Sequence, residues 1–382
     1  MHQESRWIGR PVPRVEDGRL IRGDGRFIAD LNPVPHLAHA AILRSPYAHA
    51  RIRALDAEAA RRMPGVVGVI TGEEAARVLA PFPVGVSAPI RYYPLAVSTV
   101  RYVGEPLAVV VAESRYLAED ALDCIRVDYE PLPVVLDLEE AVHRPPAFLH
   151  PELQSNVGNH RRFEYGRGEE AFRGCELVLR ERFVYPRNTA LPIETYGVIA
   201  SYDPGADEYT VWSNFHGPFT LHTVMSQALR VAPHKLRLIT PQDIGGSYGV
   251  KSAVYPYIVL IAVASRLLGR PVKWIEDRLE HLKGSSSASE RVTYISLGMD
   301  RHGKIQALKL EQYDDVGAYL RAPEPATLYR CHGNLTGPYQ IENLVVENYA
   351  VMTNRLPTGL VRGYGGPQLY FPLERMMDIA AR

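Results

Sequence analysis

The sequence predicts an α+β protein in which an N-terminal α/β domain precedes a larger α+β domain. Two observations predict this class. Short strand-like runs alternate with short helical runs over residues 26–135, and after a turn-rich stretch a second series of strands and helices begins. With 382 residues, the chain is long enough for two or three domains. We expect an extended arm at 1–25, a first domain at 26–135, a linker at 136–160 and a second domain at 161–382.

The clearest element of the first domain is a strand–helix–strand unit. Pro106–Ala112 is an apolar run that predicts a buried strand. Arg115–Ile125 follows as a helix, with Ser114 in the N-cap position that serine favours. Arg126–Tyr129 predicts the next strand. Two shorter elements, a helix at Asp56–Arg62 and a strand at Val66–Ile70, are expected before this unit.

The second domain is predicted to contain several strands, three helices and one hairpin. Single strands are expected at Cys175–Tyr185, Glu208–Ser213, Lys235–Ile239 and Val272–Glu276, and the hairpin pairs Arg291–Met299 with Ile305–Asp315. The helices are expected at Pro218–Arg230, from the loop after 249 to about Leu268, and at Pro367–Arg382. The serine run Ser285–Ser287 predicts a loop tip.

The helix at Pro367–Arg382 shows no C-cap signal. One interpretation is a frayed end. The alternative, and our expectation, is that a second chain completes the fold.

Charge, apolar runs and cysteine number restrict the class of protein. Lys+Arg and Asp+Glu both number 43, so the chain lacks the excess of basic residues that is typical of nucleic-acid-binding proteins. The longest apolar run, Ile258–Ala264, falls far short of a membrane span, and the N-terminus has no apolar signal segment. We therefore expect a cytoplasmic chain without membrane insertion. Three dispersed cysteines (Cys124, Cys175, Cys331) cannot ligate a typical iron–sulfur cluster.

Two glycine-rich segments, each leading into a helix, are the candidate ligand-binding loops. They are Gly245–Gly249 and Val361–Gln368. Glycine lets backbone N–H groups approach a ligand closely, and a helix N-terminus favours anionic groups. Neither spacing matches a dinucleotide-binding or phosphate-binding fingerprint, so each loop taken alone is more often a structural turn. For Arg362 we favour a contact with an oxyanion over a surface charge, and for Tyr364 the spacing alone favours a core aromatic.

The other polar residues give no catalytic or metal-binding motif. His216, His222 and His234 lack metal-ligand spacing and are interpreted as structural or surface histidines. The carboxylates form no evident acid/base pair. Glu194 lies in an apolar stretch, where a structural hydrogen bond is its expected role.

Four segments together resemble one family, the molybdopterin-binding large subunit of the xanthine dehydrogenase, aldehyde oxidase and aerobic carbon monoxide dehydrogenase group. They are Ile8–Pro11 with Arg22–Phe27, Tyr102–Pro106 through Val127–Pro133, Asp243–Gly249, and Arg362–Gln368. The resemblance covers essentially the whole chain. It implies an N-terminal α/β hammerhead domain followed by part of the molybdopterin-binding α+β domain.

The resemblance also implies which residues bind the cofactor. They are His216, Gly245, Gly246, Tyr248, Gly249, Arg362 and Gly363. Tyr248 stands where the family has an aromatic residue beside molybdenum. His216 stands where many members place a glutamine near the metal. Gly363 stands where carbon monoxide oxidisers carry a cysteine, which argues against carbon monoxide oxidation. No residue of this chain is expected to coordinate the metal directly.

Three further positions correspond to substrate contacts of the family. Arg330 matches an arginine that polarises the substrate, and Tyr364 matches an aromatic residue that sandwiches its ring. Ser252 stands where purine oxidisers place a glutamate, which weakens a xanthine interpretation. Members of the family are typically about twice as long and carry the catalytic glutamate in their later half. Some split this subunit into two polypeptides, so we expect the base in a partner chain.

The implied activity is oxidative hydroxylation of an N-heterocycle or aldehyde, with water as the oxygen source. The implied cofactor is a molybdenum–molybdopterin in its cytosine dinucleotide form. Electrons would leave through [2Fe-2S] and FAD subunits, and a second chain would complete the molybdenum subunit. Two alternatives stay open: hydration or alcohol/aldehyde dehydrogenation at the same cofactor, and a non-catalytic assembly partner.

Overall fold

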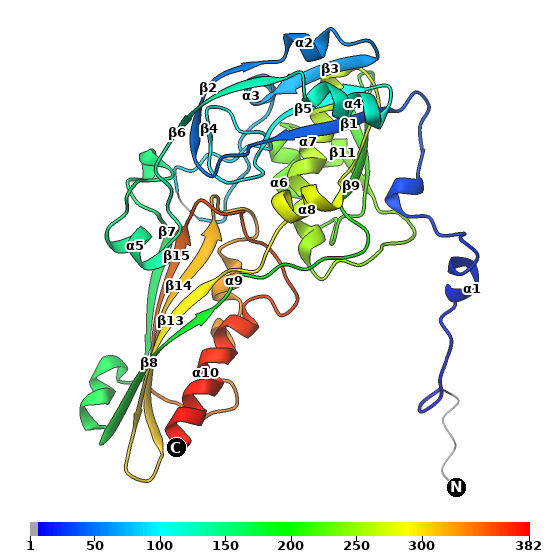
Figure 1. Ribbon diagram of the computed structural model, residues 1–382. Helices are drawn as coiled ribbons and strands as arrows, with labels where there is room; N and C mark the ends of the chain where they lie inside the picture. Colours follow the sequence, from blue (N-terminus) through cyan, green and yellow to red (C-terminus); the bar gives the residue numbers. More distant parts are fainter. Residues whose placement is uncertain (1–6, 87) are drawn as a thin grey trace.

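A seven-stranded mixed sheet forms the upper body of the molecule in the computed structural model, which describes residues 7–86 and 88–382 (Figure 1). The first six residues of the predicted arm lie outside the described residues. The strand order is β11 (Leu236–Ile239), β10 (Glu208–Ser213), β9 (Gly197–Asp203), β12 (Val272–Ile275), β1 (Ala38–Arg44), β5 (Pro106–Ala112) and β3 (Val66–Thr71). Strand β1 pairs in parallel with β12, Ala38 opposite Val272. Strands from residues 26–135 and from residues 161–382 therefore share one sheet.

The helix α7 (Tyr255–Leu268) packs against this sheet and supplies much of its core. The 3₁₀ turn Val250–Val254 leads into it, and every residue from Tyr255 to Ser265 is buried. Together these 19 residues are long and apolar enough to span a membrane, but 89% of the stretch is buried inside the fold. This degree of burial is typical of a core helix, and α7 is covered by β9, β10 and β12.

The predicted strand–helix–strand unit is confirmed. Strand β5 has the predicted bounds, α4 runs over Arg115–Leu122, and the Ser114 hydroxyl accepts the Leu117 N–H at 3.3 Å. Strand β6 (Arg126–Pro131) follows and joins β2 (Ala50–Asp56) and β4 (Thr99–Val100) in a small sheet. The short helices α2 (Glu58–Arg61) and α3 (Gly72–Val78) lie on either side of β3 in the sequence.

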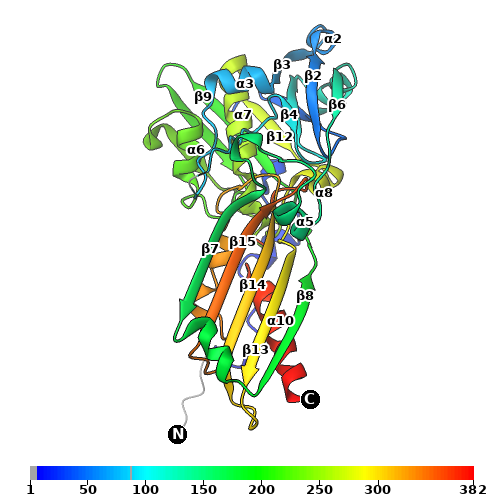
Figure 2. The same ribbon diagram turned by 90° about the vertical axis from the view of Figure 1, so that its left-hand side faces the viewer.

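A five-stranded sheet with one long helix forms the lower limb (Figure 2). Its order is β7 (Val157–Tyr165), β15 (Leu344–Met352), β14 (Ile305–Gly317), β13 (Arg291–Met299) and β8 (Leu177–Tyr185). The predicted hairpin of β13 and β14 is confirmed. Helix α10 (Gly366–Ala381) packs Leu369, Leu373 and Met376 onto one face of the sheet, because these residues repeat at helical spacing.

The arm and the predicted linker both contain short helices. Helix α1 (Asp17–Leu20) stands apart from the lower limb (Figure 1). The arm is tied to the body by Arg19, whose guanidinium donates to both carboxylate oxygens of Asp243 at 2.6 Å. This pairing lowers the pKa of Asp243 to about 2. The stretch predicted as a linker holds α5 (Leu138–His143), a 3₁₀ turn at Pro151–Leu153 and the start of β7.

Two further sequence predictions differ from the structure. The helix expected at Pro218–Arg230 is reduced to α6 (His222–Ala228). Ser285–Ser287 is no loop tip: it follows α8 (Arg278–Gly284) and is buried, with Ser286 wholly inaccessible. The buried Arg321 donates to the Ser285 carbonyl, and Gly359 N–H donates to the Ser287 carbonyl. Two carbonyls of this serine run thus find donors inside the protein.

The buried carboxylate of Asp315 closes one end of the five-stranded sheet. Arg187 and Arg355, which follow β8 and β15, lie 2.9 and 3.0 Å from its Oδ2. Its Oδ1 accepts the Thr353 hydroxyl at 2.7 Å and the Gly317 N–H at 2.8 Å. Burial alone would raise the pKa of Asp315, but these arginine charges and hydrogen bonds hold it below its usual value.

Replacing Asp315 with asparagine is expected to lower the free energy of unfolding by about 3 kcal/mol, because two arginines then lose a buried counter-charge. Chemical denaturation of the purified protein measures this. Glu290→Gln is the matched control, since Glu290 pairs with Arg355 at 3.1 Å but is partly exposed, and about 1 kcal/mol or less is expected.

The sign of the pH dependence gives a second check on Asp315. Its folded-state pKa lies below that of the unfolded chain, so its stabilisation is present above about pH 4 and is lost as the pH falls. Asp315→Asn should therefore be less sensitive to acid than the parent protein. Equal losses in Asp315→Asn and Glu290→Gln would contradict the role given to Asp315.

Candidate functional site

The candidate site lies where the chain leaves the parallel strands β14 and β15. Asp315 and Gly317 of β14 lie opposite Val351 and Met352 of β15, so both strands end at the same edge. The connection after β14 carries the short helix α9 (Ala326–Tyr329) and then Arg330. The connection after β15 carries the second glycine loop. Crevices at the carboxyl ends of parallel strands are common ligand sites, because connections diverge there.

The two predicted glycine loops meet directly. The Arg362 N–H donates to the Tyr248 carbonyl at 2.8 Å. A Cβ on Gly249 would lie 2.8 Å from the Leu360 carbonyl oxygen, so only glycine permits this approach. Tyr248 and Tyr364 have positive φ angles of 51° and 38°, which non-glycine residues rarely adopt. Such strain at facing loops is typical of a binding site.

A cavity of about 460 Å³ opens between the loops. It is lined by His216, Tyr248, Gly249, Arg330, Leu360, Val361, Arg362, Gly363 and Tyr364. Seven of these nine residues are ones that the sequence nominated. Gly245, Gly246 and Ser252 do not line it. Ser252 is 4% exposed, and its hydroxyl donates to the Gly249 carbonyl at 2.9 Å, so its substrate role stays a prediction without geometric support.

Glu194 anchors the first loop, as its expected structural role requires. Its Oε2 accepts the Gly245 N–H at 2.9 Å and the Lys251 ammonium at 2.5 Å. Lys251 is fully buried, and burial lowers its pKa although Glu194 opposes the shift. At the loop tip, His216 Nδ1 lies 3.0 Å from the Ser247 hydroxyl. The imidazole is therefore held against the loop at the cavity wall.

The first loop presents free backbone donors. Within residues 7–86 and 88–382, no hydrogen bond is made by the N–H groups of Gly246, Ser247 or Tyr248. Successive free N–H groups next to a left-handed residue bind anionic or strongly polar groups. The side chains of Arg330 and Arg362 add positive charge to the same cavity. The site thus suits a ligand with oxyanion or phosphate groups.

The second loop rests on α9. A Cβ on Gly365 would lie 2.1 Å from the Thr327 carbonyl oxygen, so the loop and helix are in backbone contact. The Arg330 guanidinium carbon lies 5.8 Å from the centre of the Tyr364 ring. This cation–π contact aligns a positive charge with an aromatic wall. Burial raises the pKa of Tyr364, and the nearby Glu324 raises it further, so the phenol is neutral at physiological pH.

Four residues of the site were missed by sequence reasoning. Leu360 and Val361 line the cavity; Val361 begins the predicted second loop, but neither residue was named as a contact, and their place directly before Arg362 was the available signal. Thr327 and Glu324 lie behind Tyr364, one helical turn apart. No sequence pattern marks them, because their relation to Tyr364 exists only after the two connections fold together.

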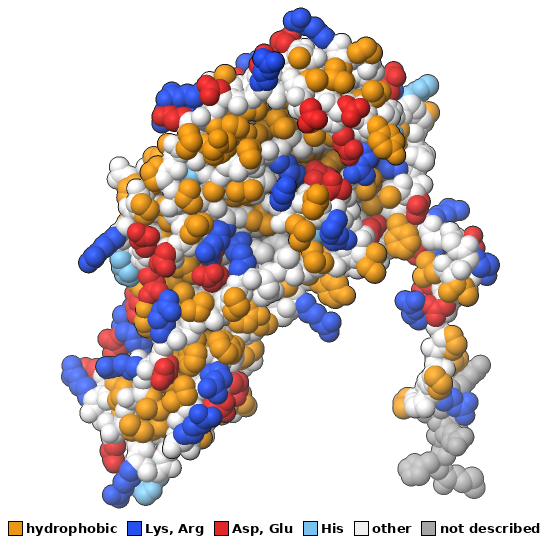
Figure 3. Space-filling view, in the orientation of Figure 1, with side chains coloured by type: hydrophobic (Ala, Val, Ile, Leu, Met, Phe, Trp, Pro, Cys, Tyr) orange, Lys and Arg blue, Asp and Glu red, His pale blue; other side chains and the backbone are white. Residues whose placement is uncertain are grey.

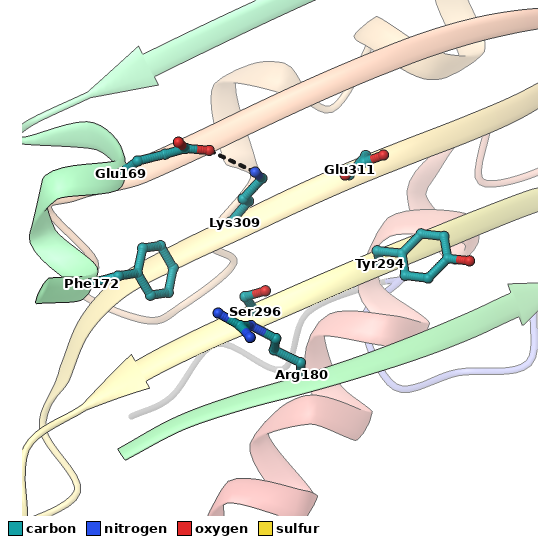
Figure 4. Close-up of a pocket in the computed structure, with 7 residues that line it drawn as sticks. All are labelled: Glu169, Phe172, Arg180, Tyr294, Ser296, Lys309 and Glu311. Carbon is teal, nitrogen blue, oxygen red and sulfur yellow. Dashed lines mark hydrogen bonds and ion pairs between the residues drawn. The ribbon is translucent and has the colours of Figure 1, made fainter. Parts of the chain in front are cut away.

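A second hollow, of about 400 Å³, lies on the face of the five-stranded sheet away from α10 (Figure 4). Its lining includes Phe172, Arg180 and Tyr294, and Glu169 pairs with Lys309 at 2.6 Å. Figure 3 shows both signs of charge interspersed over the face it displays. The hollow has no strained loop and no glycine backbone at its wall, so we place the candidate site at the glycine loops.

Among the residues that the structure describes, no group of three or more His, Cys, Asp or Glu side chains could hold a metal ion. The lining of the candidate cavity contains no carboxylate.

Comparison with known proteins places these features in one family. Residues 22–133 match the aldehyde oxidase and xanthine dehydrogenase a/b hammerhead domain. The 6-hydroxypseudooxynicotine dehydrogenase complex subunit gamma of Paenarthrobacter nicotinovorans is 37% identical over 98% of this chain and 48% of its own length. The chain thus spans about half of that relative. The nicotinate dehydrogenase large molybdopterin subunit of Eubacterium barkeri is 28% identical over the whole chain and 87% of its own length.

The fold agrees with this assignment. The crystal structure of quinoline 2-oxidoreductase from Pseudomonas putida 86 superimposes with a TM-score of 0.88 and 35% identity, covering 98% of this chain and 48% of that one. The predicted α+β class is confirmed. Because residues 149–382, more than half of the chain, match the molybdopterin cofactor-binding domain, and the hammerhead domain precedes them, the chain belongs to the molybdopterin-binding xanthine dehydrogenase/aldehyde oxidase family.

Proposed function

We propose that this chain is the cofactor-binding part of a multi-subunit molybdenum hydroxylase that hydroxylates an N-heterocycle or aldehyde with oxygen from water. The observation that carries the proposal is the convergence of Arg330, Tyr364, Tyr248 and His216 on one cavity between two glycine loops. Two relatives, nicotine 6-hydroxylase and quinoline 2-oxidoreductase, are named for N-heterocyclic substrates. Their names favour a heterocycle among the candidate substrates.

The residues present fit a molybdenum–molybdopterin group. The free N–H groups of Gly246, Ser247 and Tyr248 would hold its polar parts, and Gly249 and Gly363 would leave room for it, with Arg362 and His216 at the same wall. Gly245 would support the loop through Glu194. When bound, the group would supply two-electron redox chemistry, which no side chain of this cavity can provide.

The chain's own side chains would bind and orient the substrate. Tyr364 and Tyr248 offer aromatic walls to a flat ring, and Arg330 offers a positive charge to an oxygen or nitrogen that gains negative charge. Gly363 offers no thiol, which disfavours carbon monoxide as the substrate. Since the cavity lining has no carboxylate, the proposed base comes from a partner chain.

The remaining assignments belong to the same proposal. They are the cytosine dinucleotide form of the cofactor, a second molybdenum-subunit chain, [2Fe-2S] and FAD subunits as electron acceptors, and a cytoplasmic location. The relatives' designations as subunits of complexes support partner chains in general.

Turnover in ¹⁸O-labelled water tests the reaction class. The purified complex, given N-heterocycles and aldehydes with an electron acceptor, is expected to add one labelled oxygen to the product and reduce the acceptor. Product formed without an acceptor would indicate hydration instead. A fully assembled complex without molybdenum by metal analysis would contradict the enzyme assignment and favour an assembly role.

Arg330→Ala is expected to lower kcat/KM about 100-fold with molybdenum content unchanged, because the developing charge on the substrate loses its donor. Steady-state kinetics with metal analysis measures both. Arg180→Ala is the matched control, since Arg180 is an exposed arginine of the sheet-face hollow, and its kinetics should equal those of the parent enzyme. Unchanged turnover in Arg330→Ala would refute the proposed contact between Arg330 and the substrate.

Gly249→Ala is expected to reduce molybdenum content severalfold. Gly249 has φ of 98°, and a Cβ there would clash with the Leu360 carbonyl and separate the loops. Metal analysis per mole of complex measures the loss. Gly333→Ala is the matched control, because nothing lies within 4 Å of its Cβ position and its φ is ordinary. Full occupancy in Gly249→Ala would show that loop contact is not needed for cofactor binding.

A further inference from the structure

The N-terminal arm contacts the segment that leads into the first glycine loop. The two carboxylate oxygens of Asp243 accept from the Arg19 guanidinium at 2.6 Å each, and Oδ2 also accepts the Arg26 N–H at 2.8 Å. The Asp243 N–H donates in return to the Arg26 carbonyl at 3.3 Å. The side chains of Arg19 and Asp243 are only 25% and 10% exposed, so salt screens this ion pair less than a surface pair. Asp243 is thus bound to the arm through both its side chain and its backbone.

This segment has few other attachments. It begins where β11, an edge strand of the seven-stranded sheet, ends. Of the residues from 240 to 244, only Asp243 makes a hydrogen bond within the part of the chain that the structure describes. Pro241 is buried, whereas Gln242 and Ile244 are exposed. The polar backbone ahead of the loop is therefore held by the arm.

The arm also contacts Glu194, which anchors the loop. The Ile28 N–H donates to Glu194 Oε1 at 3.3 Å, whereas Oε2 accepts from Gly245 and Lys251. One carboxylate oxygen thus binds the arm and the other binds the loop. Ile28 is 1% exposed and packs against β9, where a Cβ on Gly197 would lie 2.4 Å from the Ile28 Cγ2. The arm is therefore fixed to the sheet at Ile28, close to the anchor of the loop.

The free N–H groups of residues 246–248 lie between two attachments of different origin. After them, the Val250 carbonyl accepts the hydroxyl of Tyr196 at 2.6 Å, and Tyr196 is wholly buried in the core. Before them, the chain is held at Asp243 by the arm and at Gly245 by Glu194. Successive N–H groups bind one anionic group only when their directions converge, so the entry of the loop must be fixed as well as its exit.

We propose that residues 19–28 of the arm brace the first glycine loop, and that Arg19 is a positioning residue for cofactor binding. This inference rests on the proposed function, since the free N–H groups hold the cofactor only there. Arg19 does not line the candidate cavity. It acts through Asp243, because a guanidinium that binds both carboxylate oxygens restricts the rotation of the carboxylate as well as its distance.

The test compares two arginine variants of the arm in the assembled complex. Arg19→Ala is expected to lower the molybdenum content per mole of complex about threefold, the size of effect of one partly shielded ion pair. Turnover per bound molybdenum should stay unchanged, because Arg19 touches no substrate. Arg22→Ala is the matched control, since Arg22 pairs with Asp24 at 3.2 Å within the arm and both side chains are more than half exposed. Its molybdenum content should equal that of the parent complex.

Backbone hydrogen exchange gives a readout that needs no turnover. Arg19→Ala should speed exchange of the Arg26 and Asp243 amides about fivefold, because these amides pair the arm with the loop entry. The amides of the buried strand β5 should exchange as in the parent, a result that a general loss of stability would not give. In an Asp243→Ala background, Arg19→Ala should not lower the molybdenum content further, because the partner of Arg19 is already gone.

Unchanged exchange of the Arg26 and Asp243 amides in Arg19→Ala would overturn the brace. Faster exchange with full molybdenum content would overturn its role in cofactor binding, as would equal losses of molybdenum in the parent and Asp243→Ala backgrounds. A parent complex without molybdenum, in which Arg19→Ala still speeds exchange, would instead refute the proposed function and support the brace as a feature of the fold.

Discussion

The carboxylate of Asp315 is the constraint on which the site depends. It is buried where β14 ends, and it gathers the chain leaving β8 and the chain leaving β15 through Arg187 and Arg355. The exit of β15 leads to the second glycine loop, and the exit of β8 leads to Glu194, which anchors the first loop. A buried charge is tolerated only when hydrogen bonds and counter-charges surround it, and here they all come from the strand ends. The positions of the loops are therefore set by the strand ends at this edge of the sheet.

The loops themselves are held by backbone contacts rather than by side chains. Gly249 lies against the Leu360 carbonyl, and Gly365 lies against the Thr327 carbonyl. Each contact excludes a Cβ, so the sequence freedom at these positions is very small. The close approach of the loops is accompanied by backbone strain, seen in the positive φ angles of Tyr248 and Tyr364. Rigid, strained loops of this kind hold a ligand in one orientation, as proximity effects in catalysis require.

Local patterns in the sequence predicted several strands with their bounds. The apolar run of β5, the first strand of the hairpin, β13, and the alternating strand β10 begin and end where predicted. The parallel pairing of β1 with β12 was not predicted, because it joins residues more than 200 positions apart. The buried serines at 285–287 were misassigned, since their carbonyls accept hydrogen bonds from remote segments, the Arg321 guanidinium and the Gly359 N–H. For the site, motif resemblance found the loops, whereas Thr327 and Glu324 carry no local signal.

The shared seven-stranded sheet restricts how the two domains can be exchanged or altered separately. Because Ala38 and His39 pair with Val272 and Lys273, the hammerhead domain shares its hydrogen-bonded ladder with the cofactor-binding region. Exchanging that domain for a relative's would need a matching strand edge in the recipient, in the same register. Substitutions in β1 and β12 are thus expected to be coupled between related proteins, although family models describe the two regions as separate domains.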